Sequence, residues 1–324
     1  EIVFAERFVE KSLRVIIVAF MFFIGLEIYG IIISFVVSAL ASLIIIYFFS
    51  RKFYSFRKGF DKEILLFSLP LFFSTALYKM LFNIDSLFLG YFTNARDVAL
   101  FNIANPSAQL LFIIQTSLLA IFLPTIAEKY AKNKNIIGEY KIVNKWLLAI
   151  ILPIVLLILL FGKEFLLLLF GKDSVPAYFS FVVLSFFYAI YIVSISSENI
   201  LIMAKKTKLI FYIYTIGFFT SVILNLFLIP YFYESYGSGI NGAAIARSLA
   251  YLFIAMLNFY FAFKTTKIRI ADNNIIKMLF IGVICFLVVY ILKMFFYSLV
   301  FVIIISAVFV ICYLYLLVLS GVFS

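Results

Sequence analysis

Residues 64–91 read ILLFSLPLFFSTALYKMLFNIDSLFLGY, an apolar run that contains only two charged residues, Lys79 and Asp85. A helix needs about 20 predominantly apolar residues to cross the hydrocarbon core of a bilayer, so this run is long enough to span one. Similar runs recur along the whole chain. The sequence therefore predicts about ten membrane-spanning helices, at residues 12–26, 29–50, 64–91, 98–125, 143–161, 177–203, 208–231, 240–263, 275–293 and 298–320.

The composition also requires a membrane environment. Hydrophobic residues make up 66% of the chain and charged residues 13%, with a mean hydropathy of +1.21. A soluble domain contains roughly 45–50% apolar and about 25% charged residues. Because backbone polar groups in lipid have to be hydrogen-bonded within their own segment, the apolar runs are predicted to be helices. We expect an all-α fold, a polytopic membrane helix bundle.

Basic residues alternate between the two sides of the predicted spans. One side carries 20 of the 26 Lys and Arg residues. Basic loops stay cytoplasmic during insertion, so this side and the C-terminus are predicted to be cytoplasmic, in a cell membrane. The residues of this side are Arg7, Lys11, Arg14, Arg51, Lys52, Arg57, Lys58, Lys62, Lys129, Lys132, Lys134, Lys141, Lys145, Lys205, Lys206, Lys208, Lys264, Lys267, Arg269 and Lys277.

Several classes of function are disfavoured. The chain has no His, and its two Cys residues lie inside apolar runs, so we expect no metal site. The net charge of +11 is assigned to anionic lipid headgroups rather than to nucleic acid. The glycine pattern at 237–242 follows a membrane span rather than a strand, so it is interpreted as an outer turn with close helix packing instead of a dinucleotide site. We expect neither an enzyme nor a cofactor.

A weak internal repeat sets Gly25 against Gly237, with seven identities in 28 aligned positions at an offset of 212 residues. Segments of one composition also match by chance. If the repeat is real, residues 1–62 are the end of an N-terminal bundle, with two spans and a cytoplasmic linker. Residues 63–270 are then a C-terminal six-helix bundle, and 271–324 add two further spans. The earlier bundle would begin about 150 residues before Glu1, and paired bundles are a transporter architecture.

Two consecutive predicted spans carry polar stripes. On a continuous helix, Thr75, Lys79, Asn83, Ser86 and Gly90 fall within an arc of about 80°. In the next span Asn102, Asn105, Gln109 and Thr116 fall within about 60°. Either these stripes line a shared watery cavity or they hydrogen-bond neighbouring helices together. Two aligned stripes and a Lys favour the cavity.

Three further ionisable residues lie inside predicted spans. Arg247 either binds an anionic substrate or pairs with Asp85. Glu198 lies beneath Lys205 and Lys206 near the cytoplasmic end, where an interfacial salt bridge is favoured over a carboxylate that couples transport to an ion.

Several stretches resemble one family. They are NIDSLFLGYF (83–92), FNIANPSAQL (101–110), FLP (122–124), NLFLIP (225–230) and GINGAAIA (239–246). They resemble Wzx-type polysaccharide flippases of the multidrug/oligosaccharidyl-lipid/polysaccharide exporter superfamily, which also contains lipid II flippases and MATE exporters. The resemblance implies a MATE- or lipid II flippase-like fold in which this chain corresponds to helices 5–14 of a 14-helix protein.

The resemblance also implies a function. The expected substrate is an oligosaccharide on a polyprenyl phosphate or pyrophosphate, flipped by alternating access for cell-surface polysaccharide synthesis. Lys79 and Arg247 would bind phosphate, and Asn83, Asn102, Asn105 and Gln109 would bind sugar. Membrane lipids and glycan-assembly membrane proteins are the other expected partners. The main alternative is a MATE-like exporter of small organic cations, which should have carboxylates in its cavity.

Overall fold

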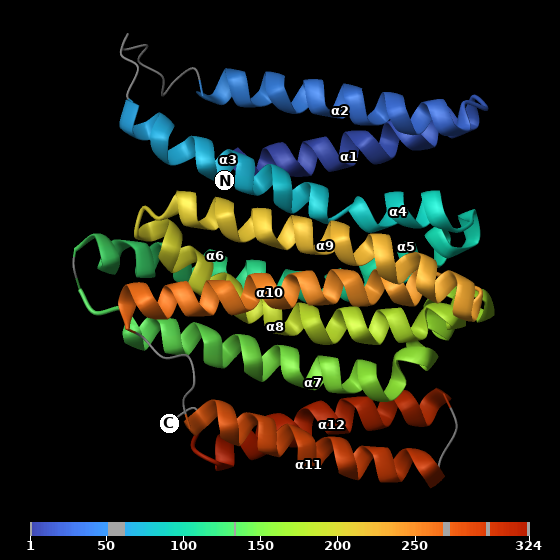
Figure 1. The fold of residues 1–324 in the computed structure, drawn as a ribbon, viewed down its shortest axis with the longest axis vertical. Coiled ribbons are helices and arrows are strands. Elements are labelled where there is room, and N and C mark those ends of the chain that lie inside the picture. The colour runs from blue at the N-terminus through green and yellow to red at the C-terminus, as the bar shows by residue number, and fades with distance from the viewer. Residues whose placement is uncertain (1, 51–61, 133, 268–272, 296–298, 323–324) are drawn as a thin grey trace. The chain divides into compact units, whose positions relative to one another are not determined.

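The computed structural model describes residues 2–50, 62–132, 134–267, 273–295 and 299–322 (Figure 1). Within these ranges the regular structure is helical throughout, which confirms the all-α prediction. The contacts divide the chain into two units, residues 1–61 and 62–324. The predicted basic linker after Ser50 lies outside the described residues, and the three-part division made from the repeat stays a prediction.

Unit 1 is a helical hairpin. Helix α1 (Ile2–Phe23) packs against α2 (Glu27–Ser50). Gly25 joins them with φ +83°, a left-handed conformation that glycine adopts without steric cost. Arg14 is ion-paired to Glu10 one turn earlier in α1, and its Nε donates to the Ser38 hydroxyl of α2 at 3.3 Å. A charged side chain inside an apolar hairpin is thus satisfied internally.

Unit 2 contains the remaining helices. They are α3 (Lys62–Leu81), α4 (Ile84–Phe92), α5 (Ala95–Gln109), α6 (Leu111–Ala131), α7 (Ile137–Phe170), the short 3₁₀ helix η1 (Lys172–Ala177), α8 (Tyr178–Met203), α9 (Thr207–Tyr236), α10 (Ile240–Thr266), α11 (Asn273–Phe295) and α12 (Leu299–Leu319).

Helix α10 lies at the centre of unit 2, packed against α8 and α9 (Figure 1). Its buried face is rich in small residues, including Gly242, Ala243, Ala246 and Ala250, which let neighbouring helices approach closely. Helices α3 and α4 pack on α9, α5 packs on α8, and α7 packs on α8. The α11–α12 hairpin lies against α7.

Two predicted spans are broken in the structure. The run 64–91 forms α3 and α4, with the break at Phe82 and Asn83, and the run 98–125 forms α5 and α6, with a tight turn at Leu110. The prediction of one continuous helix in each run is therefore wrong. At each break an amide bonds three residues back instead of four, Asn83 to Met80 and Leu110 to Ser107.

The glycine-rich turn between α9 and α10 is a site of close packing, as predicted. Gly237 caps α9 at φ +73°. A Cβ on Gly242 would overlap the backbone carbonyl of Leu228. In unit 1, Gly25 and Gly30 occupy the equivalent positions of the α1–α2 hairpin, with φ +83° at Gly25 and a clash of any Gly30 Cβ with Met21. The same two glycine roles recur at the repeat offset.

Eight helical segments among the described residues are long and apolar enough to cross a membrane. The other two predicted spans are also helical. Helix α1 contains five charged residues and is not among the eight. In α12 the apolar segment is shorter, Ile304–Leu319. The chain is a multi-pass membrane protein.

Candidate functional site

The break between α3 and α4 leaves backbone carbonyls without their helical partners, and Arg247 of α10 supplies the missing donors. Its Nη2 donates to the carbonyl oxygen of Phe82 at 2.7 Å and to that of Leu81 at 3.4 Å. Its guanidinium carbon lies 5.9 Å from the centre of the Phe82 ring. Arg247 therefore stabilises the break, because an unpaired carbonyl buried within a membrane protein is costly.

The same guanidinium forms a buried ion pair. Its Nε donates to Asp85 Oδ2 at 2.5 Å, and both side chains are 0% exposed. Asn225 of α9 donates to the other carboxylate oxygen, Oδ1, at 2.7 Å, and also donates to the backbone carbonyl and hydroxyl of Ser221. Of the two options left open for Arg247, the pairing with Asp85 is present, and the guanidinium is buried.

A further set of bonds links this ion pair to α5. Arg247 Nη1 donates to the Tyr188 hydroxyl of α8 at 3.2 Å, and that hydroxyl donates to Asn105 Oδ1 at 2.7 Å. Gln109 donates to the same oxygen at 3.0 Å. Asn105 is 5% exposed, so it belongs to the packed interior rather than to a cavity wall. We call Asp85, Arg247, Tyr188, Asn105 and Asn225 the buried cluster.

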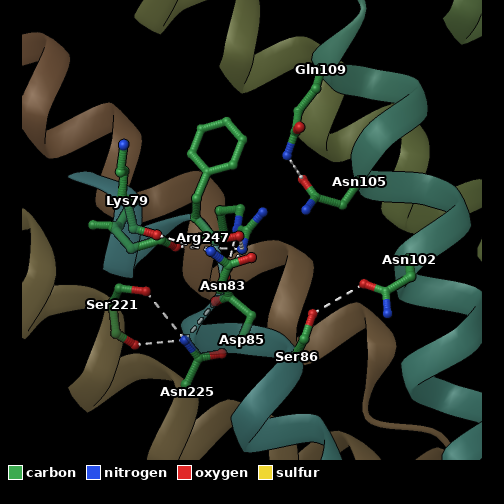
Figure 2. Close-up of polar contacts among 12 residues, drawn as sticks. Lys79, Asn83, Asp85, Ser86, Asn102, Asn105, Gln109, Ser221, Asn225 and Arg247 are labelled. Carbon is green, nitrogen blue, oxygen red and sulfur yellow. Dashed lines mark hydrogen bonds and ion pairs between the residues drawn. The ribbon is translucent and has the colours of Figure 1, made fainter. Parts of the chain in front are cut away.

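Beside the buried cluster lies an accessible polar face. Lys79, Asn83 and Asn102 are exposed, and Ser86 is partly exposed. Ser86 donates to Asn102 Oδ1 at 3.1 Å, which joins α4 to α5, and Asn83 donates to the Lys79 carbonyl at 3.1 Å. Figure 2 shows the Lys79 ammonium pointing away from the buried cluster and unbonded to any residue drawn. We call Lys79, Asn83, Ser86 and Asn102 the polar strip.

The helix break explains which predicted residues come together. A continuous helix would place Asp85 about 120° from Lys79. In the structure Asp85 lies in the first turn of α4 and is buried. Lys79, Asn83 and Asn102 share the polar strip, whereas Asn105 and Arg247 are withdrawn into the buried cluster, with Gln109 partly exposed at its edge.

Glu198 lies apart from both groups of residues, and the salt bridge predicted for it is wrong. It accepts a hydrogen bond from the Tyr214 hydroxyl at 2.8 Å. Lys205 instead pairs with Glu63 at 2.8 Å, and Lys206 donates to the Thr265 hydroxyl. Bonding to the Glu63 carboxylate raises the pKa of the exposed Lys205 above its usual range.

The sequence did not single out Tyr188, which belongs to the buried cluster, or Ser221, which accepts hydrogen bonds from Asn225 of that cluster. Tyr188 is one of many aromatic residues in the chain, and only its hydroxyl distinguishes it from packing residues. The bond from Asn225 to Asp85 joins α9 to α4. No group of His, Cys, Asp and Glu that could hold a metal ion occurs among the described residues.

Comparisons with known proteins agree with this architecture. Residues 1–130 match the family model for polysaccharide biosynthesis proteins, and residues 70–227 match the MatE family model. A solved structure, "Lipid II flippase MurJ, inward closed conformation", superposes with a TM-score of 0.72 at 13% identity, over 94% of this chain. Both matches agree with the resemblance to the multidrug/oligosaccharidyl-lipid/polysaccharide exporter superfamily. The N-terminal match is to the polysaccharide branch of that superfamily.

The chain spans 65% of the length of the MurJ structure, and at 13% identity that likeness shows the fold alone. No curated protein sequence matches the chain. The polar strip lies within the overlap of the two family models, residues 70–130, as do Asp85 and Asn105 of the buried cluster. Tyr188 and Asn225 lie in the MatE match alone, and Arg247 lies beyond both matches.

Proposed function

We propose that the protein flips an oligosaccharide linked to a polyprenyl phosphate or pyrophosphate across the cell membrane, for synthesis of a surface polysaccharide. The match of residues 1–130 to polysaccharide biosynthesis proteins and the likeness to a lipid II flippase support this function. The lysine-rich helix ends, with the C-terminus, would face the cytoplasm. The protein would act as a transporter rather than an enzyme.

The exposed ammonium group of Lys79 is the main support for this function. Lys79 is exposed on the polar strip, in the middle of an apolar segment long enough to cross the membrane, and its ammonium group is bonded to none of the residues drawn in Figure 2. An ionised side chain at such depth is costly unless it faces water or a counter-ion. A phosphate group would supply that counter-ion through a charge-assisted hydrogen bond.

The other residues of the polar strip suit the sugar. Asn83 and Asn102 carry amide groups, and Ser86 a hydroxyl, which can donate to and accept from sugar hydroxyls. Arg247 and Asn105, predicted as ligands, would act indirectly, because the buried cluster holds the α3–α4 break and α5 in place. Asp85 would be a structural partner and not an ion-coupling group.

A MATE-like exporter of organic cations is the second candidate, because residues 70–227 match the MatE model. An organic cation would be bound by an accessible carboxylate. The polar strip contains none, and the nearest carboxylate, Asp85, is 0% exposed and paired with Arg247. The charge on the strip is positive, which favours an anionic substrate.

Transport in vesicles tests the choice. The full-length protein would be reconstituted with a fluorescent polyprenyl-pyrophosphate oligosaccharide, and Lys79→Gln compared with Lys79→Arg. Loss of a charge-assisted bond worth about 1.5–3 kcal/mol should slow flipping about tenfold or more in Lys79→Gln. Lys79→Arg should retain most of the activity.

Lys172→Gln is the matched control, since it removes an exposed Lys from η1, away from the strip. Equal flipping by wild type, Lys79→Gln and Lys172→Gln would refute the role of Lys79. Movement of a cationic dye without movement of the lipid-linked sugar would replace the proposed function with the second candidate.

A further inference from the structure

Glu198 is a carboxyl group inside the helical bundle that the proposed function does not use. It lies on α8 five residues before the helix ends at Met203, close to the basic end of the bundle. The residue is partly exposed, while its Oε2 accepts a hydrogen bond from the Tyr214 hydroxyl of α9 at 2.8 Å. It is therefore within reach of water although it packs between two helices.

The hydrogen-bond partner of Glu198 is a neutral hydroxyl group. The Tyr214 hydroxyl is also 2.8 Å from the Tyr191 hydroxyl, and the Tyr214 ring packs edge-on against Tyr78 of α3. No ion pair to Glu198 forms among the described residues. Nearby basic residues have other partners or face solvent. Lys205 is paired with Glu63, Lys206 donates to Thr265, and Arg247 is paired with Asp85. Lys208 and Lys264 are exposed.

Helix α10 adds an unsatisfied amide at the same level. Asn258 is 0% exposed, and neither its nitrogen nor its oxygen has a hydrogen-bond partner. Tyr251 of α10 packs on Tyr188 and Tyr191 of α8, and the two helices run parallel. Asn258 lies two turns beyond Tyr251, which places it at the depth of residues 195–198 of α8. The Tyr251 hydroxyl is likewise buried without a partner. Buried polar groups of this kind are usually hydrogen-bonded to protein or to ordered water.

We propose that the Glu198 carboxyl is a proton-binding site inside the bundle, separate from the polar strip, which exchanges its proton with water at the basic end. An ionised carboxylate here has only neutral donors to offset its removal from water, whereas the neutral acid is readily accommodated. The step is a single proton transfer: a hydronium ion or buffer acid gives up its proton, and the carboxylate becomes a carboxylic acid.

Protonation would change the direction of the neighbouring hydrogen bonds. The carboxylate can only accept, so Tyr214 donates to it and accepts from Tyr191. The carboxylic acid can donate to Tyr214, which then donates to Tyr191, and the Tyr191 proton needs a new acceptor. The contact between α8 and α9 thus differs between the two states, which makes the packing of the basic end responsive to pH.

Infrared spectroscopy of the full-length protein in lipid vesicles tests this site without requiring transport. Lowering the pH should produce an infrared band of the protonated carboxyl group. The ratio of protonated to ionised Glu198 obtained from its intensity should change tenfold per pH unit, as for a single site. The band should be absent in Glu198→Gln and shifted in frequency in Tyr214→Phe, which removes the hydrogen bond. It should be unchanged in Glu164→Gln, the control, whose carboxyl is ion-paired to Lys293 on another part of the bundle.

A band that persists in Glu198→Gln, or one that is insensitive to Tyr214→Phe, would overturn the proposal. A transport measurement, which rests on the proposed function, adds a second readout: flipping should lose its pH dependence in Glu198→Gln and keep it in Glu164→Gln. Identical pH profiles in both variants would also overturn it. If wild type moves no lipid-linked sugar at any pH while the band behaves as expected, the proton site stands and the proposed function fails.

Discussion

Replacing Asp85 by Asn should destabilise unit 2 strongly, because the carboxylate is shared by two donors. Its Oδ2 accepts from Arg247 and its Oδ1 from Asn225, and all three side chains are 0% exposed. The Asn side chain has the same shape but carries an NH₂ group in place of one oxygen. That NH₂ group would face either the Arg247 or the Asn225 donor, and one of the two hydrogen bonds would be lost. The guanidinium also loses its counter-charge.

The magnitude follows from the burial. Removing one partner of a buried ion pair costs about 3–5 kcal/mol, since the remaining charge stays buried and uncompensated. Arg247 keeps its bonds to the Tyr188 hydroxyl and to the Phe82 carbonyl, which places the loss near the lower end of that range. A loss of about 3 kcal/mol lowers the ratio of folded to unfolded protein by about a hundredfold.

Equilibrium unfolding of the purified protein in mixed detergent micelles measures this effect. Glu63→Gln is the control, because it makes the same chemical change in the exposed pair with Lys205, and it should leave the unfolding midpoint unchanged. A midpoint for Asp85→Asn that equals that of Glu63→Gln would refute the argument that the buried cluster holds the α3–α4 break together.

Two more predictions concern packing and site assignment. Gly242→Ala should lower the free energy of unfolding by about 1–3 kcal/mol in the same assay, because the added methyl group meets the rigid Leu228 carbonyl. Gly138→Ala is the control and should cost nothing, because the space around Gly138 is open. Equal unfolding midpoints for the two variants would contradict the close packing of α9 and α10. Asn105→Ala should lower stability because its oxygen accepts two buried bonds. Asn102→Ala should slow flipping with little loss of stability, and the reverse pattern would exchange their assigned roles.

The membrane helices could be predicted because hydrophobic run length and basic-residue spacing act residue by residue along the chain. The Gly237 and Gly242 roles were also accessible, since a tight turn and a close helix approach each require glycine. The expectation of one continuous helix is wrong at Phe82 and Asn83, between α3 and α4. That break is stabilised by Arg247, which lies more than 160 residues away in the sequence.

The assignment of the candidate site had the same limit. Lys79 and Asn83, which share one predicted stripe, are exposed. Asn105 shares the stripe of Asn102, yet it is buried because Tyr188 and Gln109 bond to its oxygen. Periodicity shows which face of a helix is polar, but it does not show whether that face meets water or another helix.

Cysteine labelling measures whether water reaches the polar strip at membrane depth. Asn83→Cys and Asn102→Cys would be made in a background carrying Cys285→Ser and Cys312→Ser, together with Ile223→Cys as an equally superficial apolar position on α9. A membrane-impermeant thiol reagent should label positions 83 and 102 in vesicles and spare position 223. Protection of all three positions would contradict a hydrated path along the strip.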